Sequence, residues 1–249
     1  MPNILILGGT TEASALAQAV AARGLRATLS YAGRVASPKP QPVPVRIGGF
    51  GGVSGLTEYL RDEAITHLVD ATHPFAAQMS RNAVLAAKAA NVPLIALTRP
   101  VWTPKPGDTW HTVPDVAAAV AALTGAGRNV MLALGRTHVE AFAAQPRHRY
   151  LLRYVDPPNA PPPLADHHLV VDRGPFTNAG DEALLRAHAI DLVVCKNAGG
   201  SGAQAKLVAA RALGLPVLMI DRPALPARHQ VADVAKVLHW IANEADRGV

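Results

Sequence analysis

The sequence contains a single cysteine, Cys195, among 249 residues. One thiol excludes an intrachain disulfide and any metal cluster built on cysteines, and its place in the apolar run 192–195 indicates core packing. No apolar run approaches the roughly 18 to 20 residues that a membrane-spanning helix needs. Residues 1–7 lack the basic segment and the length of a signal peptide. We therefore expect a cytoplasmic protein with no membrane partner and no bound metal.

Three catalytic motifs are also absent. The sequence has no GxxxxGKS/T loop, which argues against a P-loop NTPase, and no GxSxG turn, which argues against an ordinary serine hydrolase. None of the four tyrosines is followed by a lysine four residues later. The catalytic pair of the short-chain dehydrogenases is therefore missing as well.

Acidic residues are outnumbered by basic ones, with 18 Asp and Glu against 24 Lys and Arg, for a formal net charge of +6. The arginines are scattered along the chain, whereas a nucleic-acid-binding protein gathers them in a basic run or stripe. We therefore expect no nucleic acid partner. A small molecule with several negative charges fits the charge balance better.

Short apolar runs alternate with longer alanine-rich segments almost from end to end, which is the repeated βα pattern of a parallel sheet covered by helices. Strands are expected near residues 3–7, 26–30, 43–47, 67–71, 93–97, 129–134, 149–154, 168–172, 191–195 and 216–220. Helices are expected near residues 11–23, 54–63, 75–90, 114–123, 136–144, 178–188, 202–213 and 231–244. The predicted fold class is α/β, with two Rossmann-like parallel-sheet domains in tandem and an interdomain cleft.

A proline-rich segment between the fifth and sixth expected strands suggests the domain boundary. Residues 99–108 contain three prolines and one glycine, and such a segment suits neither a helix interior nor a central strand. We expect a first domain over residues 1–100, a linker over 101–108 and a second domain over 109–249.

The first strand runs directly into Gly8, Gly9 and Thr10, after which a helix begins. A glycine turn between a strand and a helix is typical of a phosphate-binding loop, because the helix N-terminus attracts anions. Here the Thr10 hydroxyl is expected to be free to meet a phosphate. Glu12 in the first helical turn argues against this interpretation, and the alternative is a purely structural βα turn.

The second strand ends at Ser30 and continues into Tyr31, Gly33 and Arg34. NAD-binding folds place an acidic residue near this point to hold the ribose 2′-OH, whereas an arginine suits the 2′-phosphate of NADPH. The predicted cofactor is therefore NADPH, bound by the domain over residues 1–100. The glycine-rich run that starts at Gly48 and Gly49 is either a second point of close ligand approach or only a mobile loop.

The fourth strand ends in the densest polar cluster of the chain, which contains Asp70, Thr72 and His73. A histidine beside a helix N-terminus tends to stay neutral, so it can donate a hydrogen bond or pass a proton. We predict that Thr72 and His73 take part in catalysis and that Thr72 also contacts the cofactor. The alternative is that Asp70 caps the backbone and His73 packs.

Two strand-to-helix turns in the second domain carry cations. Arg136 follows one strand and Lys196 ends another, each beside glycines that could bring backbone amides to an anion. We expect these residues to bind the substrate, with Lys196 also a candidate proton donor; the alternative for Lys196 is an ordinary solvated side chain. The predicted substrate-binding residues are Arg136, Lys196, Asn197, Gly199, Gly200 and Ser201.

Four motifs together resemble the precorrin-6A reductase family of cobalamin (vitamin B12) biosynthesis: GGTTE after the first strand, YAGR after the second, DATHPFA after the fourth and KNAGG late in the chain. The likeness spans nearly the whole chain. It implies NADPH-dependent reduction of a C=C bond in the macrocycle precorrin-6A to give precorrin-6B. It also implies a tetrapyrrole substrate with many carboxylates, which agrees with the excess of basic residues, and it allows handover to neighbouring enzymes of the pathway.

Several alternatives stay open at this point. The similar enzyme of the anaerobic route reduces the cobalt-bound macrocycle, and another NADPH oxidoreductase of a small polyanionic substrate fits the same residues. A nucleotide-sensing module or a sugar-nucleotide transferase is a further class. The proton that accompanies the hydride could come from His73, Lys196 or a bound water.

Overall fold

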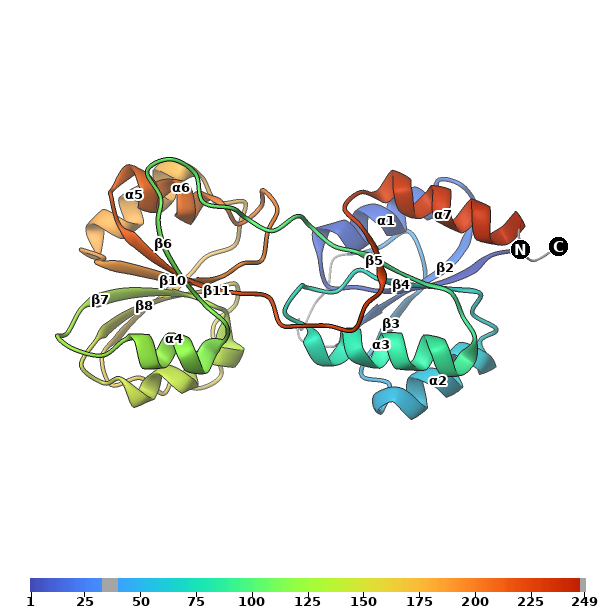
Figure 1. Ribbon diagram of the computed structural model, residues 1–249, viewed down its shortest axis with the longest axis horizontal. Helices are drawn as coiled ribbons and strands as arrows, with labels where there is room; N and C mark the ends of the chain where they lie inside the picture. Colours follow the sequence, from blue (N-terminus) through green and yellow to red (C-terminus); the bar gives the residue numbers. More distant parts are fainter. Residues whose placement is uncertain (33–39, 247–249) are drawn as a thin grey trace. The chain divides into compact units, whose positions relative to one another are not determined.

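The computed structural model describes residues 1–32 and 40–246, and the chain divides into two compact units. The first unit combines residues 1–100 with the chain from Ala224 onward, and the second covers Val101–Pro223. Each unit has a parallel six-stranded sheet with helices on both faces (Figure 1). The predicted fold class of two Rossmann-like α/β domains is confirmed.

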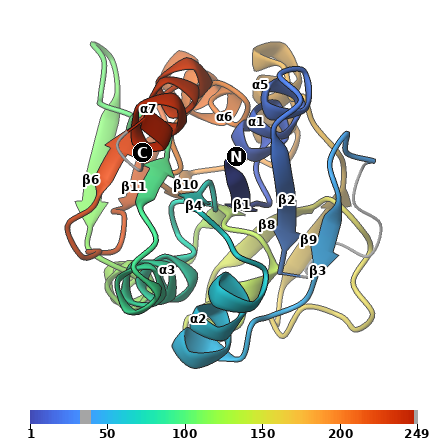
Figure 2. The same ribbon diagram turned by 90° about the vertical axis from the view of Figure 1, so that its right-hand side faces the viewer.

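The sheet of the first unit has the strand order β12-β5-β4-β1-β2-β3. Its strands are β1 (Asn3–Leu7), β2 (Arg26–Tyr31), β3 (Val45–Ile47), β4 (His67–Asp70), β5 (Leu94–Leu97) and β12 (His229–Val231). Its helices are α1 (Thr11–Ala21), α2 (Gly52–Asp62), α3 (Ala77–Ala90) and α7 (Val234–Asp246). Helices α1 and α7 cover one face of the sheet, and α2 and α3 cover the other (Figures 1 and 2).

The buried strand β1 shows why helices cover both faces. Successive side chains of a strand point to opposite faces. Ile4 and Ile6 accordingly pack into the cluster that contains α1 and α7, whereas Leu5 and Leu7 pack into the cluster that contains α2 and α3. A strand buried on both faces therefore reads as a continuous apolar run.

The second unit repeats this arrangement, with the strand order β6-β11-β10-β7-β8-β9. Its strands are β6 (Thr109–Val113), β7 (Asn129–Ala133), β8 (Arg149–Tyr154), β9 (His167–Val171), β10 (Leu192–Lys196) and β11 (Pro216–Ile220). Its helices are α4 (Val116–Ala122), α5 (Asn178–Ala187), α6 (Ala205–Ala212) and the 3-10 helices η1 (Arg136–His138) and η2 (Glu140–Ala144). In a Rossmann sheet the strand order reverses between the first and fourth strands. These two strands are β1 and β4 in the first unit and β7 and β10 in the second.

Ten predicted strands are confirmed, and two short edge strands, β6 and β12, were not predicted. The helix expected over residues 136–144 consists of two 3-10 segments. Helix α3 starts at Ala77, not at residue 75, because the chain first makes a turn in which the Ala76 amide donates to the His73 carbonyl. Pro74 therefore lies in this turn and not at the helix start.

The expected domain boundaries differ from the observed units at two places. Residues 224–249 were expected in the second domain, but β12 pairs with β5, and Val237 and Ile241 of α7 are buried in the core of the first unit. The expected linker 101–108 also belongs to the second unit, because the Trp102 side chain is buried in the core of that unit. Burial of these apolar side chains explains both differences.

This topology predicts that the C-terminal helix stabilises the N-terminal sheet. Ile241→Ala removes a side chain that is only 1% exposed, so we expect the free energy of unfolding of the first unit to fall by about 2–5 kcal/mol. Leu85→Ala is the matched control, because Leu85 is 51% exposed on α3 of the same unit. Urea unfolding measures both variants, and equal stability of the two would contradict the role of α7.

Candidate functional site

In a parallel α/β sheet, ligands bind outside the carboxyl ends of the strands where the strand order reverses. In the first unit this point lies between β1 and β4, where Leu7 is paired with Asp70. The segments that leave the two strands are residues 8–10 and 71–73. The predicted glycine turn and the predicted polar cluster therefore meet at one edge of the sheet.

The two glycines of the first turn have separate physical reasons. A Cβ on Gly8 would lie 2.6 Å from the Leu29 Cδ1 atom, so any larger residue there would require the buried Leu29 side chain to shift. Gly9 has φ +113, which an L side chain rarely adopts, and a Cβ there would meet no atom within 4 Å. The backbone of Gly9 is therefore accessible to a ligand on this side.

The Thr10 hydroxyl corrects one expectation. Its oxygen accepts a hydrogen bond from the Ala13 amide at 3.1 Å, as an N-cap of α1, and its proton is donated to the Ala71 carbonyl at 2.8 Å. The hydroxyl is therefore not free to donate to a phosphate, because it joins the glycine turn to the end of β4. The Gly8 amide already donates to the Ser30 carbonyl at 2.8 Å, so the later amides of the turn are the groups that could meet an anion.

Glu12 does not stand as an unpaired charge at this helix end. The Arg99 Nε atom lies 3.1 Å from the Glu12 Oε1 atom, and the two side chains are 14% and 26% exposed. Arg99 follows β5 and brings a guanidinium to the first turn of α1. The repulsion that Glu12 would exert on a phosphate is thus offset by a neighbouring positive charge.

Asp70 is the centre of a buried polar cluster that ties three segments together. Its Oδ1 atom accepts from the Thr72 amide at 3.1 Å and from the Thr72 hydroxyl at 2.6 Å. Its Oδ2 atom accepts from the Ser80 hydroxyl at 2.6 Å and forms an ion pair with the Arg228 guanidinium. The Asp70 and Arg228 side chains are 1% and 9% exposed. The Asp70 carboxylate therefore holds the 71–73 segment in place through its two contacts with Thr72.

His73 is exposed, in contrast to Asp70. Its Nδ1 atom accepts a hydrogen bond from the Phe75 amide at 3.2 Å. A neutral imidazole that accepts at Nδ1 carries its proton at Nε2, so this nitrogen can donate. Thr72 is less suited to donation, because its hydroxyl proton is already given to Asp70.

Arg46 of β3 organises the end of β2 and the glycine-rich loop. Its Nη1 atom donates to the Gly48 carbonyl at 2.6 Å and reaches the Ser30 hydroxyl at 3.4 Å, and its Nη2 atom donates to the Gly49 carbonyl at 2.8 Å. Its guanidinium carbon lies 3.8 Å from the centre of the Phe50 ring. The Arg46 side chain therefore joins the start of this loop to the end of β2.

The predicted cofactor residues at the end of β2 are only partly described. Ser30 is buried and Tyr31 packs partly against the core that includes α1. Gly33 and Arg34, the predicted partner of a 2′-phosphate, lie outside the described residues.

The second unit brings Arg136 and Lys196 to its own reversal point, between β7 and β10. The Lys196 Nζ atom lies 3.4 Å from the Leu134 carbonyl, just before Arg136. The Arg136 Nη2 atom donates to the carbonyls of Asp156 and Pro157 at 2.5 and 3.2 Å. Both cations therefore lie at the carboxyl edge of the sheet, as the sequence predicted.

Arg173 and Arg222 lie at the same edge, and the charge of Arg173 is paired with that of Asp156. Arg173 follows β9, and its Nη2 atom lies 2.8 Å from the Asp156 carboxylate. Arg222 follows β11 and donates to the carbonyls of Asn197 and Ala198 at 2.9 and 3.1 Å. Arg222 was not among the predicted substrate ligands.

Asn197 is corrected to a structural residue. Its side-chain amide accepts from the Trp102 amide at 2.8 Å and donates to the Trp102 carbonyl at 3.0 Å, and Asn197 is only 7% exposed. These contacts hold the 101–108 segment against β10, so the amide group is not available to a substrate.

The glycine loop after Asn197 contains two residues with positive φ. Gly199 and Gly200 have φ of +71 and +75, and the Gly200 carbonyl accepts from the Trp102 Nε1 atom at 2.7 Å. Ser201 is exposed at the end of this turn. Binding of a substrate carboxylate by these residues stays a prediction.

The sequence analysis did not identify three arginines that lie at the carboxyl edges of the two sheets: Arg46, Arg222 and Arg228. Arg228 lies 158 positions from Asp70 in the sequence, and no local motif marks such a pair. The run 222–228 before β12, which contains Pro223 and Pro226, is the feature that could have indicated a structured segment. Only the structure shows that Arg228 pairs with Asp70.

Two Rossmann-type sheets, each with a glycine turn and polar side chains at its reversal point, define the class of the protein as a two-unit Rossmann-like α/β protein. Residues 3–242 match the family model described as "Precorrin-6x reductase CbiJ/CobK". The chain belongs to this family, and the resemblance noted from the four motifs is confirmed.

Relatives support this assignment along the entire chain. A precorrin-6A reductase of Rhodobacter capsulatus is 56% identical over 251 residues, which cover 100% of both chains. A cobalt-precorrin-6A reductase of Priestia megaterium is 29% identical over 97% of this chain and 98% of its own. The solved structure "CobK precorrin-6A reductase" matches with a TM-score of 0.94 at 56% identity, over 98% of this chain and 97% of that chain.

No helix in the described parts of the chain is long and apolar enough to cross a membrane.

The Asp70 cluster predicts a large stability cost when Arg228 is lost. Arg228→Met leaves the buried carboxylate without its cation, so we expect the free energy of unfolding to fall by about 3–5 kcal/mol. Asp70→Asn in the Arg228→Met background should recover part of the loss, because the unpaired charge is then gone. Arg23→Met, which changes an exposed arginine of the same unit, should cost less than about 0.5 kcal/mol. A double variant as unstable as Arg228→Met in urea unfolding would contradict the assignment.

Proposed function

We propose that the protein is an NADPH-dependent oxidoreductase that reduces a C=C bond of precorrin-6A to give precorrin-6B in cobalamin biosynthesis. The observation that carries this proposal is the 56% identity, over the entire length of both chains, to a precorrin-6A reductase. The relatives are reductases, so a nucleotide sensor and a sugar-nucleotide transferase are not proposed.

The cobalt-free macrocycle is the favoured substrate. Precorrin-6A reductases of Rhodobacter capsulatus and Rhodococcus erythropolis are 56% and 50% identical to this chain, whereas the cobalt-precorrin-6A reductases of Priestia megaterium and Synechocystis are 29% and 26% identical. Reduction of the cobalt-bound macrocycle is the alternative that the experiment below tests. Handover of the product to a neighbouring enzyme of the pathway stays a prediction.

The residues of the first unit fit a dinucleotide. The accessible backbone above Gly9, at the N-terminus of α1, suits a pyrophosphate. Arg99 compensates Glu12 at the same helix end. Ser30, Tyr31, Gly48 and Gly49 would border the adenosine ribose, with Gly33 and Arg34 as the predicted contacts of the 2′-phosphate. When bound, NADPH supplies the hydride.

The residues of the second unit fit a polycarboxylate. Arg136 and Lys196 lie at the carboxyl edge of the sheet, next to the loop of Gly199, Gly200 and Ser201. A guanidinium and an ammonium at one edge pair with separate carboxylates of a macrocycle, and their spacing orients the ring. Arg173 lies at the same edge in an ion pair with Asp156.

His73 is the proposed proton source of the first unit, and Lys196 is that of the second. The His73 Nε2 atom carries the proton when Nδ1 accepts from the Phe75 amide. Thr72 serves to position this loop and the nicotinamide, because its hydroxyl proton is held by Asp70. The net change adds one hydride and one proton across the C=C bond, and the electron pair of the hydride comes from the cofactor.

A steady-state assay under anaerobic conditions tests the function. We expect NADPH oxidation with precorrin-6A and little with the cobalt-bound macrocycle, and a preference for NADPH over NADH. Arg34→Ala should reduce that preference by about 10-fold or more, because loss of a charge-assisted contact costs about 1.5–3 kcal/mol. Arg23→Ala is the control. Turnover of the cobalt form alone would overturn the substrate assignment, and an unaltered NADPH to NADH ratio in Arg34→Ala would refute the role of Arg34.

A second experiment separates proton donation from binding. His73→Ala should lower kcat by about 100-fold or more, since general acid catalysis contributes typically 100- to 10,000-fold. The NADPH affinity should be unchanged, because the histidine contacts the reacting end only. Lys196→Ala is measured in parallel, and full turnover in both variants would leave water as the donor and remove both side chains from that role.

A further inference from the structure

A recess of about 180 Å³, a volume that includes the solvent at its mouth, lies at the amino edge of the second sheet. Asn129 and Arg149 are the first residues of β7 and β8, His168 is the second residue of β9, and His188 follows α5. Arg136 follows β7 and Lys196 ends β10, so both lie at the carboxyl edge of the same sheet. The recess and the proposed substrate residues therefore lie at opposite edges of the sheet, one strand length apart.

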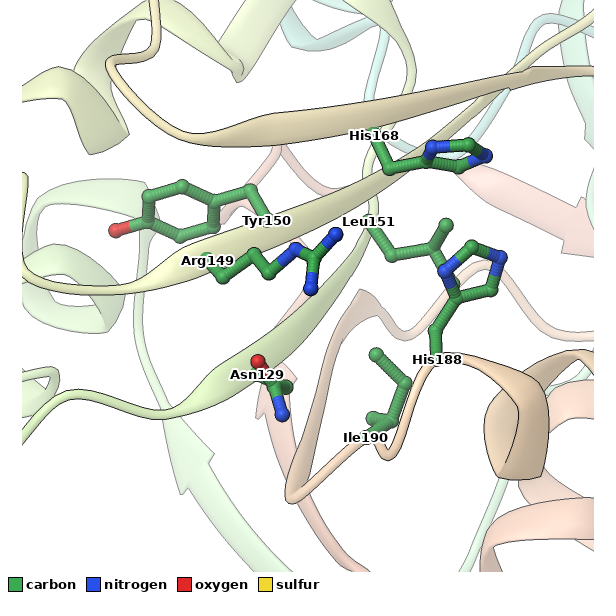
Figure 3. Close-up of a pocket in the computed structure, with 7 residues that line it drawn as sticks. All are labelled: Asn129, Arg149, Tyr150, Leu151, His168, His188 and Ile190. Atoms are coloured by element: carbon green, nitrogen blue, oxygen red, sulfur yellow. The ribbon is translucent and has the colours of Figure 1, made fainter.

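Three basic side chains from separate elements gather in this recess. The imidazole rings of His168 and His188 lie with their centroids 4.5 Å apart and their planes at 39°. Figure 3 shows the Arg149 side chain extending toward these two rings, and Leu151 and Ile190 forming the apolar part of the lining. Burial and the charges of His168 and Arg149 lower the pKa of His188. The three groups therefore act on one another electrostatically.

Two carboxylates, those of Asp166 and Asp191, lie near the recess and partly offset its positive charge. The Asp166 Oδ1 atom is 3.8 Å from the Arg149 Nε atom, and the two side chains are 64% and 59% exposed, so the ion pair is weak. Asp191 accepts from the Asn129 amide at 2.8 Å. On α5, Arg186 and Glu182 pair with each other.

His167 takes no part in the recess. Adjacent residues of a strand point to opposite faces, and the His167 Nδ1 atom is bound to the Leu164 carbonyl at 2.9 Å.

The charge of Arg149 decides between a cation and an anion as the ligand. Two imidazoles can bind a transition metal, but a permanent guanidinium beside them opposes a metal ion. Among the described residues, no group of three or more His, Cys, Asp or Glu side chains could hold a metal. Guanidinium and imidazolium groups together suit an oxyanion, to which each donates charge-assisted hydrogen bonds.

We propose that this recess is a second binding site, for a tetrahedral oxyanion of the size of sulfate or phosphate, held by Arg149, His168 and His188. The recess is too small for a tetrapyrrole, so the ligand is a free oxyanion or the phosphate group of a small metabolite. Because the anion stabilises the protonated imidazoles, it binds more tightly as the pH falls.

The proton linkage gives the direction of the pH effect on stability. Without an anion, the folded-state pKa of His188 lies below its unfolded value of about 6.5. Its contribution to stability is therefore present above pH 6.5 and is lost as the pH falls. An anion reverses this trend, because it raises the pKa of both imidazoles in the folded state.

The test follows the histidine ring resonances of the full chain by NMR between pH 5.5 and 8.5, with sulfate or with chloride at equal ionic strength. Sulfate keeps the same charge over this range. We expect the signals of His168 and His188 to shift with sulfate and to titrate at higher pH. The sulfate Kd should be on the order of tenfold lower at pH 6 than at pH 8, which corresponds to one unit of pKa change. His168→Gln and His188→Gln assign the two signals.

Arg149→Gln should abolish the sulfate shift, and Arg186→Gln, an exposed arginine of the same unit paired with Glu182, should keep it. A parallel titration with acetate distinguishes a tetrahedral oxyanion from a carboxylate, and a titration with Zn²⁺ tests a metal. Sulfate shifts that persist in Arg149→Gln, an adventitious ion only, would overturn the proposal. So would signals of His168 and His188 that move with Zn²⁺ or acetate and not with sulfate.

Discussion

The structure of the first unit depends on one buried carboxylate, Asp70. A carboxylate taken out of water costs several kcal/mol unless hydrogen bonds and a cation compensate it. Here two contacts come from Thr72 in the next segment, one from Ser80 on α3 and one from Arg228 near the C-terminal end of the chain. The cation is thus supplied by the segment that leads directly into β12 and α7. The candidate cofactor edge of an N-terminal sheet is completed by the C-terminal segment.

The sheet topology explains why the chain must return. In a Rossmann sheet of six strands the order is 3-2-1-4-5-6. Residues 1–100 supply only the first five positions of the first sheet, and β12 fills the sixth beside β5. The second sheet has the same order, but its sixth position is filled by β6, which precedes the other five strands in the sequence. In each unit, the strand at the sixth position therefore does not follow the fifth strand directly in the sequence. A single domain boundary along the sequence consequently assigns residues 224–249 to the wrong unit.

The sequence was sufficient for features that are local. The buried strands read as apolar runs, the glycine turn at Gly8 follows its strand directly, and Lys196 and Arg136 occur at strand ends, so fold class, ten strands and the family could be predicted. Features that depend on distant contacts could not. Thr10 donates to Ala71, Asn197 bonds to Trp102, and Arg228 pairs with Asp70, over 61, 95 and 158 positions. Polar side chains at a strand end look the same in the sequence whether they face a ligand or bind another segment.

The central claim is that hydride passes from a nicotinamide held by the first unit to the macrocycle. Single turnover with NADPH deuterated at C4, in separate reactions with the R and S forms, tests it most directly. The account predicts that precorrin-6B made with one of the two forms is one mass unit heavier than precorrin-6B made with unlabelled NADPH. The product made with the other form should have the unlabelled mass. A product that gains no deuterium from either form, with precorrin-6A consumed, would contradict it.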